Sequence, residues 1–511
     1  MDLRRPCIRF VPRTAATAFV RDFARPSRTL SWVLTAAMLC LSGLVAPPQV
    51  WAQKERLAEA VMRRDAQSWE MAQKIWAWAE PGYQERQSSQ LLSEAMEKAG
   101  FRVERGVAGI PTAFTATIGS GQPVLGILGE YDALPGLSQQ AVPTREPAQT
   151  GGYGHGCGHH LFGVASATAA MALAEQIQSG QLRGTVRFYG CPAEEGGSAK
   201  VFLVRDGLFR DCDVVLHWHP GDRNSAGDRS STARMAAKFR FHGKSAHAAG
   251  APDQGRSALD AVELMNHAAD KLREHVPDGT RIHYVITHGG GAPNVVPDVA
   301  EVYYYVRHPK SEVVRDVYRR VVLCAQAGAL ATETRLETRF EGGIKEILPN
   351  NALAQVAVAN LRQLNDLSFT DEDIAFATRL QESIERPRPL ESIREVEFRT
   401  GGPPGMGSTD VGDVSWVVPT TGFSTVCFVP GTPGHSWQAV ASGGTRIGRQ
   451  GMNLAAKVLA ATAWDVMRDP ARIAAAQEEF KRRTTSQKYF SLMEPNQQPP
   501  LDYRQRMAGS E

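Results

Sequence analysis

A chain of 511 residues is long enough for two or three domains, each with its own hydrophobic core. With 42% apolar and 22% charged residues, its composition is that of an ordinary soluble globular protein. Residues 1–52 carry seven Arg and two Asp, so the rest of the chain, with 50 basic and 52 acidic residues, has a net charge of −2. This balance argues against a surface for nucleic acid or for anionic membranes.

The first 52 residues have the pattern of a secretory signal peptide. An Arg-rich start precedes the apolar run TLSWVLTAAMLCLSGLVA, and the small-residue pattern VWA follows at residues 50–52. We therefore expect cleavage after Ala52 and an exported protein, periplasmic or secreted, with no membrane attachment after cleavage. The alternative is a membrane anchor, but the run is short for a membrane span and a cleavage pattern follows it.

Cysteine usage does not predict a disulfide framework. Five cysteines follow the signal, and they are odd in number and widely scattered, with no repeated spacing. An exported protein that keeps an unpaired cysteine beside several histidines indicates another role for that cysteine. Metal ligation is one such role.

After the signal, helical and strand-like patterns alternate along the chain. Helical patterns cover residues 53–78, 85–98 and 161–178. Strands are expected at residues 101–107, 113–118, 124–128, 185–189 and 214–219. Strands that alternate with helices predict an α/β fold with a mostly parallel sheet, in which functional sites gather at the carboxyl ends of the strands.

Near residue 230 the pattern changes to a β-α-β-β-α-β order, which predicts an inserted ferredoxin-like α+β domain. Its strands are expected at residues 235–241, 281–288, 300–307 and 334–341, and its helices at 258–274 and 313–331. The larger domain resumes with a strand at 425–429 and a helix at 445–467, and the polar segment that follows is expected to be only partly ordered. The predicted organisation is a signal at 1–52, a catalytic domain at 53–230 and 346–470, an inserted domain at 231–345 and a polar tail at 471–511.

The stretch GHGCGHHLFG at residues 154–163 contains the first candidate metal ligands. Cys157 and His159 stand at the start of a predicted helix, where exposed backbone N–H groups favour a thiolate. A thiolate and a neutral imidazole are natural ligands for zinc-like cations. Taken alone, such a motif is more often a glycine-rich loop with hydrogen-bonded histidines.

Further candidates follow other predicted strands. Glu194 and Glu195 are adjacent in the turn CPAEEGG, so one can bind a metal while the other faces a metal-bound water, a division that suits hydrolysis. The alternatives are a solvated carboxylate pair and isolated structural histidines. Because all the candidates come just after strands of one sheet, they predict a dinuclear metal centre with the ligands Cys157, His159, Glu195, His219 and His435.

Eight motifs occur in an order that resembles the aminoacylase/carboxypeptidase G family of metallopeptidases, and in particular its amidohydrolase branch, which includes plant auxin-conjugate hydrolases. The resemblance covers roughly residues 55–470. The motifs are GEYDALPG, GCGHHLFG, PAEEGG, LHWHP, GKSAHA, PNVVPD, GSTDVGDVS and PGHSW. The resemblance implies hydrolysis of the amide bond of an N-acyl or N-aroyl amino acid, such as a p-aminobenzoyl-glutamate-like conjugate. It also implies a homodimer formed through the inserted domain, which would act as a lid.

Residue by residue, the resemblance implies that the five candidate ligands hold two divalent metal ions, zinc or manganese, with cobalt as a further option. Glu194 matches the general base, and Asp132 matches an Asp that holds a ligand in place. In the inserted domain, His247 resembles a residue that reaches a substrate carbonyl, often across a dimer interface. Asn294 and Arg307 resemble residues that contact a substrate oxygen or carboxylate. The alternative for these three is an incidental polar surface.

Two features depart from the family pattern. His160 stands where relatives often carry Asp or Asn, and the loop at 136–153 is long; either could alter the substrate pocket. His155 and His160 are assigned supporting or structural roles. Three other functions stay open: a dipeptidase or carboxypeptidase of the same family, a metal-dependent binding protein without catalysis, and an enzyme with Cys157 as nucleophile, which would leave the Glu pair and His435 without a role.

Overall fold

The computed structural model describes residues 48–504. The predicted signal peptide therefore lies almost entirely outside the described residues, and the compact main part of the chain begins at Lys54. In the described part, no helix has both the length and the apolar character needed to cross a membrane. All five cysteines found there are free thiols.

The larger sheet has eight strands and is mixed but mostly parallel at its centre. Its order is β1-β2-β4-β3-β5-β12-β6-β11, and β4, β3, β5 and β12 run parallel to one another. Every residue of β3 is buried, as expected for a parallel strand covered on both faces. The strands are β1 (Arg102–Arg105), β2 (Phe114–Ser120), β3 (Val124–Glu130), β4 (Gly184–Cys191), β5 (Val214–Gly221), β6 (Asn224–Gly227), β11 (Val396–Arg399) and β12 (Thr420–Val426).

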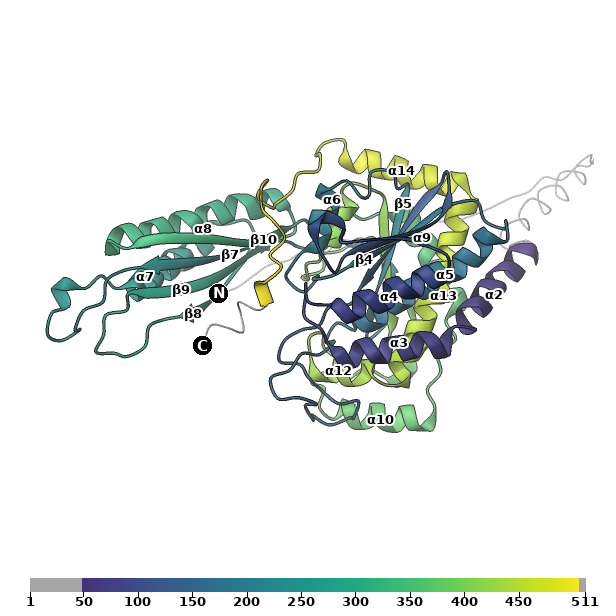
Figure 1. The fold of residues 1–511 in the computed structure, drawn as a ribbon, viewed down its shortest axis with the longest axis horizontal. Helices are drawn as coiled ribbons and strands as arrows, with labels where there is room; N and C mark the ends of the chain where they lie inside the picture. Colours follow the sequence, from purple (N-terminus) through teal and green to yellow (C-terminus); the bar gives the residue numbers. More distant parts are fainter. Residues whose placement is uncertain (1–47, 505–511) are drawn as a thin grey trace, which may run out of the picture. The chain divides into compact units, whose positions relative to one another are not determined.

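Helices cover both faces of this sheet (Figure 1). One hydrophobic cluster includes residues of α3, α4, α5, α9 and α13, and a second includes residues of α6 and α11. The helices are α2 (Pro48–Met62), α3 (Asp65–Trp78), α4 (Arg86–Lys98), α5 (His159–Gln178), α6 (Ala199–Arg205), α9 (Asn351–Leu364), α10 (Asp371–Gln381), α11 (Val411–Ser415), α12 (Trp437–Gly443), α13 (Arg446–Arg468) and α14 (Pro470–Thr484), with short 3-10 turns at Val107–Gly109 and Leu390–Arg394.

The close approach of α5 to β3 is the feature of the fold that matters most for the site. α5 is buried from His159 to Ala174 and is built largely of Ala and other small residues. A Cβ atom at Gly163 would lie 2.6 Å from the backbone oxygen of Glu130, so only glycine permits this contact. The first turn of α5 is thereby held against the carboxyl end of β3.

The inserted segment forms its own four-stranded antiparallel sheet in the order β10-β7-β9-β8, which is the ferredoxin-like arrangement. α7 and α8 pack on each other and on β7 and β9, so they share one face of the sheet (Figure 1). The elements are β7 (Ala233–His242), α7 (Ala258–Leu272), β8 (Arg281–His288), β9 (Val299–His308), α8 (Ser311–Thr332) and β10 (Arg335–Ile344), with 3-10 turns at Pro252–Gln254 and Arg273–His275. The predicted fold class is confirmed.

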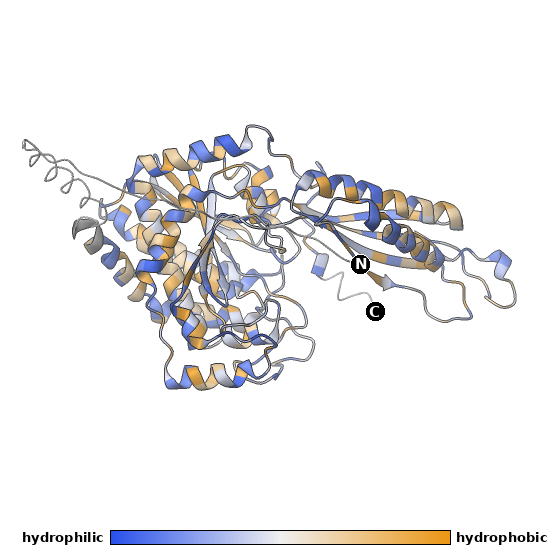
Figure 2. Cartoon of the chain, turned by 180° about the vertical axis from the view of Figure 1, so that it is seen from behind, coloured by the Kyte–Doolittle hydropathy of each residue, from blue (hydrophilic) through white to orange (hydrophobic). Residues whose placement is uncertain are grey.

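Hydrophobic and hydrophilic residues alternate along outer helices such as α8 and α14, as is typical of amphipathic helices (Figure 2). The inserted domain has its own core, and its edge strand β8 exposes Tyr284, Val285 and Ile286. Exposed apolar residues on an edge strand mark a surface suited to association.

The segment after residue 470 differs from the expectation of partial order. It forms α14 and then continues through residues 485–504, where Leu492, Met493 and Tyr503 are buried. Some of its polar groups bond to the rest of the protein: Arg205 donates to the backbone oxygen of Gln497 (2.6 Å), and the Tyr489 hydroxyl donates to Asp413 Oδ1 (2.9 Å). The difference, which concerns residues 470–504, arises because a polar composition does not distinguish a solvated tail from a segment that packs on the rest of the protein.

Candidate metal centre and substrate cavity

The five predicted ligands lie at one edge of the larger sheet. Asp132 directly follows β3, His219 lies near the end of β5, and the Glu194–Glu195 pair follows β4. His435 lies in the loop after β12, and Cys157 and His159 stand at the start of α5. These strands are neighbours with the same direction, so their carboxyl ends meet.

The ligand atoms form two groups that share Cys157. Cys157, His159 and His219 place one ligand atom each within 4.8 Å of one another, and so do Cys157, Glu195 and His435. A third group of this kind joins Glu130, which the sequence did not single out, to His159 and Glu194. The structure thus brings all five predicted ligands and the predicted base together.

Asp132 fixes two of these residues at once. The Nδ1 atom of His159 lies 2.9 Å from Asp132 Oδ1, and the backbone N–H of Glu195 donates to Asp132 Oδ2 over 2.9 Å. All of these side chains except Glu195 are fully buried. A carboxylate that binds one imidazole nitrogen leaves the other nitrogen directed at a cation, which is the usual support for a metal-binding histidine.

The remaining donor atoms fit a cation site. The Nδ1 atom of His219 lies 2.7 Å from the backbone oxygen of Pro220 and must donate to it, which leaves Nε2 as the ligating nitrogen. His159 Nε2 lies 3.1 Å from Glu130 Oε2, and Glu195 Oε1 lies 3.5 Å from His435 Nε2, but among the described residues neither of these buried atoms makes a well-aligned hydrogen bond. Buried polar atoms without partners are costly, and a divalent ion would satisfy both.

The charges of the site favour a cation. Burial would lower the pKa of His159, but Asp132 and Glu130 raise it to about 10, so without a metal this histidine holds a proton. The negative field that holds this proton would equally hold a divalent ion. Burial, together with the neighbouring His159, lowers the pKa of His219 to about 4, which keeps His219 in its neutral, ligating form.

Cys157 behaves differently from the expectation that its position alone makes it a thiolate. Burial, followed by the carboxylates of Glu195 and Glu194, raises the pKa of the Cys157 thiol well above its usual value. These effects outweigh the start of α5, so the thiol keeps its proton unless a cation displaces it. The environment therefore suits a metal ligand and disfavours an unassisted nucleophile.

Glu194 lies beside a buried network of ion pairs that the sequence did not reveal. Burial, and then the carboxylates of Glu130 and Glu195, raise its pKa well above the usual value. Glu130 pairs with Lys200 (2.6 Å), and Lys200 pairs with Asp410 (2.6 Å); all three are buried. Glu130 and Asp410 fall inside the motifs GEYDALPG and GSTDVGDVS, so their signal was present but carried no assigned role.

Two residues at the site adopt a left-handed backbone that non-glycine residues rarely take. Ala193, just before the Glu pair, has φ 53°, and His435 has φ 54°. The N–H of His435 donates to the backbone oxygen of Gly156 (3.3 Å), which ties the His435 loop to the Cys157 loop. Strain of this kind persists where the surrounding structure fixes a functional geometry.

A cavity of about 570 Å³ opens beside the ligands, a volume typical of small-molecule sites. One wall carries Cys157, Glu194, Glu195 and His435, and an adjoining apolar part is formed by residues such as Leu134 and Leu137. An arginine-rich wall carries Arg307 as predicted, together with three residues that the sequence did not indicate: Arg234, Tyr305 and Arg504. It adjoins the metal-binding wall, because Arg504 donates to the backbone oxygen of Glu195 (2.5 Å).

The two other predicted substrate residues lie elsewhere in the chain. His247 and Asn294 are exposed loop residues, joined where Ala248 N–H donates to the Asn294 backbone oxygen (2.9 Å). These loops precede β9, whereas Arg307 is near its end, and ten residues of strand span roughly 30 Å. Within one chain they do not line the cavity, so their contact with substrate would require a second chain.

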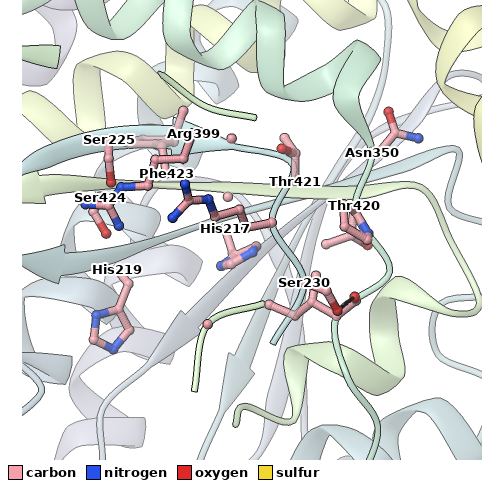
Figure 3. Close-up of a pocket in the computed structure, with 17 residues that line it drawn as sticks. His217, His219, Ser225, Ser230, Asn350, Arg399, Thr420, Thr421, Phe423 and Ser424 are labelled. Carbon is pink, nitrogen blue, oxygen red and sulfur yellow. Dashed lines mark hydrogen bonds between the residues drawn. The ribbon is translucent and has the colours of Figure 1, made fainter. Parts of the chain in front are cut away.

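A second, smaller cavity of about 270 Å³ is lined in part by His219. Figure 3 shows His219 at its edge, with His217, Thr421 and Ser424 from β5 and β12 along it. Burial, and then His219, lower the pKa of His217 to about 3, so this ring is neutral. The lining includes two arginines and several hydroxyl groups but no carboxylate.

Comparison with known proteins agrees with this geometry. Residues 231–333 match the peptidase dimerisation domain. The chain is 40% identical over 473 residues to one of the subunits of p-aminobenzoyl-glutamate hydrolase from Escherichia coli (strain K12), covering 87% of this chain and 98% of that one. It is 30% identical to the Xaa-Arg dipeptidase of Mus musculus, covering 84% and 91% of the two chains.

Among solved structures, the fold matches a dinuclear metal-binding peptidase of the M20 family from Bacillus subtilis with a TM-score of 0.55, at 16% identity and over 80% of this chain and 99% of that chain. Fold, dimerisation domain and ligand clusters define a metal-binding hydrolase of amide bonds. The chain belongs to the M20 family of metallopeptidases, which confirms the family expected from the sequence motifs.

Proposed function

We propose that this protein hydrolyses the amide bond between an acyl or aroyl group and an amino acid, as in p-aminobenzoyl-glutamate, using two divalent metal ions. The observation that carries this proposal is the pair of ligand groups sharing Cys157, with Glu194 beside them. The 40% identity to the p-aminobenzoyl-glutamate hydrolase chain of E. coli, over 98% of that chain, supports the substrate class.

In this mechanism the side chains have separate tasks. Bound metal ions would supply a Lewis acid for the amide carbonyl and acidify a water molecule. The carboxylate of Glu194 takes a proton from the attacking water and passes it to the leaving nitrogen. Asp132 keeps His159 and the Glu195 backbone in place through its two oxygens. Arg307, which also lines the cavity, binds the carboxylate of the amino acid through its guanidinium group.

The proposed ligands are Cys157, His159, Glu195, His219 and His435. A mixed set of sulfur, nitrogen and carboxylate oxygen donors suits zinc, and manganese or cobalt are the alternatives that availability would decide. Elemental analysis of the purified protein, with two metal equivalents expected per chain, tests both the number and the identity of the ions.

A dipeptidase of the same family is the second candidate, because the Xaa-Arg dipeptidase of mouse is 30% identical over 91% of its length. The cavity argues against a C-terminal arginine as substrate, since Arg234, Arg307 and Arg504 line it and would repel a cationic side chain. A binding protein without catalysis would have no use for Glu194.

A hydrolysis screen tests the proposal. Metal-loaded protein is incubated with p-aminobenzoyl and acetyl conjugates of several amino acids and with Xaa-Arg dipeptides, with and without a chelator. We expect amide cleavage that the chelator abolishes and added metal restores. Cleavage of Xaa-Arg dipeptides alone would establish the second candidate instead, and chelator-insensitive cleavage that thiol alkylation blocks would establish Cys157 as a nucleophile.

Two further proposals concern assembly and location. The match of residues 231–333 to a dimerisation domain and the exposed apolar residues of β8 support a homodimer through the inserted domain, although the E. coli relative is named as one subunit of its enzyme, which makes a different chain the alternative partner. Light scattering of the purified chain should give twice its mass. The N-terminal pattern supports export, and N-terminal sequencing of the exported protein should begin at Gln53.

A further inference from the structure

The segment after α14 packs against the cores of both sheets. Leu492 belongs to the hydrophobic core of the inserted domain, and the N–H of Gly343 in β10 donates to the sulfur of Met493 (3.3 Å). Farther along, Tyr503 is buried among residues of the α6 and α11 side of the larger sheet. These contacts hold residues 485–504 in one path.

This path ends at the metal-binding wall of the cavity. Arg504 donates through Nη2 to the backbone oxygen of Glu195 (2.5 Å), and the Tyr503 hydroxyl lies 3.3 Å from the same oxygen. The Tyr503 ring also packs edge-on against Tyr83, with the ring centroids 5.8 Å apart. The guanidinium of Arg504 is therefore anchored next to the residue proposed to bind metal, and it lines the cavity.

Two more guanidinium groups face the same space. Arg234 is 7% exposed, lies over the ring of Tyr305 with 4.9 Å between Cζ and the ring centroid, and its Nε has no hydrogen-bond partner among the described residues. Arg307 lies 5.5 Å from the same centroid and donates to Ser408 Oγ (3.1 Å). Within residues 48–504, neither Arg234 nor Arg307 donates a hydrogen bond to a carboxylate.

Arg234 is a buried guanidinium with an unused hydrogen-bond donor, and a bound anion would stabilise it, because buried charged groups are normally paired and hydrogen-bonded. A substrate with one carboxylate would place that group on Arg307, as proposed above. Arg234 would then receive no negative charge from the ligand, and Arg504 adds a further positive charge to the same cavity. A leaving amino acid with a second carboxylate on its side chain supplies the counter-charge, and guanidinium groups bind carboxylates with two parallel hydrogen bonds. The apolar part of the cavity, near Leu134 and Leu137, is left for the acyl or aroyl group.

We propose that Arg504, together with Arg234, forms a subsite for the side-chain carboxylate of the leaving amino acid, so that the C-terminal segment selects conjugates of acidic amino acids. This inference rests on the proposed function, because it specifies which amide substrates the same cavity takes. It makes Arg504 a specificity-determining residue.

The test compares two conjugates that differ only in the charge of one group, p-aminobenzoyl-glutamate and p-aminobenzoyl-glutamine. In the metal-loaded full chain, Arg504→Gln should raise KM for the glutamate conjugate about 10- to 100-fold, the loss expected for a hydrogen bond between charged groups, and change KM for the glutamine conjugate less than about threefold. Arg504→Lys should recover part of the loss. Arg482→Gln, an exposed arginine of α14, is the matched control and should behave as wild type.

Binding is measured separately from turnover. Both conjugates are titrated calorimetrically into metal-loaded Glu194→Gln protein, with and without Arg504→Gln. Tighter binding of the glutamate conjugate that depends on Arg504 supports the subsite, even if wild type cleaves neither conjugate, in which case only the proposed function fails. If wild type cleaves and binds both conjugates equally well, or if Arg504→Gln weakens both equally, the subsite is overturned while amide hydrolysis stands.

Discussion

The two walls of the cavity are built in different ways. The metal-binding wall comes from the carboxyl ends of four neighbouring parallel strands, and its polar atoms are fixed by Asp132 and by buried charge pairs. The arginine wall comes from β7, β9 and the C-terminal segment. Its groups are held by Tyr305, by Ser408 and, where the two walls meet, by the backbone oxygen of Glu195. One wall is organised around a cation and the other around an anion.

This difference separates chemistry from selectivity. Ligands and base must keep a fixed geometry, so they stand on a rigid sheet edge. The groups that contact the variable part of a substrate stand on an inserted domain and a terminal segment, which can change while the sheet edge stays intact. Changes in the two walls should therefore have separable effects: loss of turnover or metal on one side, altered substrate preference on the other.

The largest effect is expected at the base. Glu194→Gln should lower kcat about 10²- to 10⁴-fold because no carboxylate takes the proton of the attacking water. The metal content, measured by elemental analysis, should stay unchanged, since Glu194 is not among the five proposed ligands. Glu478→Gln, an exposed glutamate of α14, is the control. Near-normal kcat in Glu194→Gln would show that the general-base assignment is wrong.

The support of the ligands comes next. Asp132→Asn should weaken metal binding about 10- to 100-fold, because the amide no longer fixes the proton on Nδ1 of His159 as a carboxylate does. Competition with a chromophoric chelator measures this affinity, and excess metal should restore much of the activity. Asp253→Asn, on the surface of the inserted domain, should leave affinity unchanged. Unaltered metal affinity in Asp132→Asn would contradict the role of Asp132.

On the arginine wall, Arg307→Gln should raise KM about tenfold for every conjugate with a free carboxylate, because a charge-assisted hydrogen bond is lost. Metal content should not change. The comparison with Arg335→Gln, an exposed residue of β10, separates this loss from a general effect on the inserted domain. If Arg307→Gln instead removed the metal, the two walls would not be independent.

The smallest effect is expected at His160. Its ring packs on His155 at 4.9 Å, and its Nε2 lies 3.1 Å from the Gly443 backbone oxygen, so it faces α12 and not the ligands. His160→Asn should change kcat/KM less than about threefold and cost about 1 kcal/mol of unfolding free energy through the altered hydrogen bond. Denaturant titration and steady-state kinetics measure both. A tenfold loss of kcat would place His160 in the metal site after all.

The metal-binding wall was largely predictable from the sequence. Glu195 and His435 follow parallel strands, His219 lies near the end of one, and Cys157 stands at the start of the helix that leads from β3 to β4. Parallel strands end at the same edge, so local patterns were enough to bring these residues together. The same reasoning gave the ferredoxin-like order of the inserted domain. Glu130, Lys200 and Asp410 were missed because ion pairs buried behind a site have no spacing signature. Only three-dimensional contact relates the strand, the helix and the loop that carry them.

The arginine wall was mostly not predictable. Arg307 followed from a motif resemblance, but Arg504 lies in a polar segment whose composition indicates a solvated tail. Its position is set by contacts such as Tyr503 with Tyr83, which join parts of the chain far apart in the sequence. The role of His247 was not testable for a different reason. Within one chain His247 does not line the cavity, so its contact with substrate would require a second chain.

The path of residues 485–504 has a consequence for proteolysis. All five ligands and the base precede this segment in the chain, whereas Arg504 lies at its end. A cut within the segment would therefore keep the ligands in the chain and release Arg504 from the cavity. We expect such a clipped enzyme to keep part of its amide hydrolysis and to lose part of its preference among conjugates.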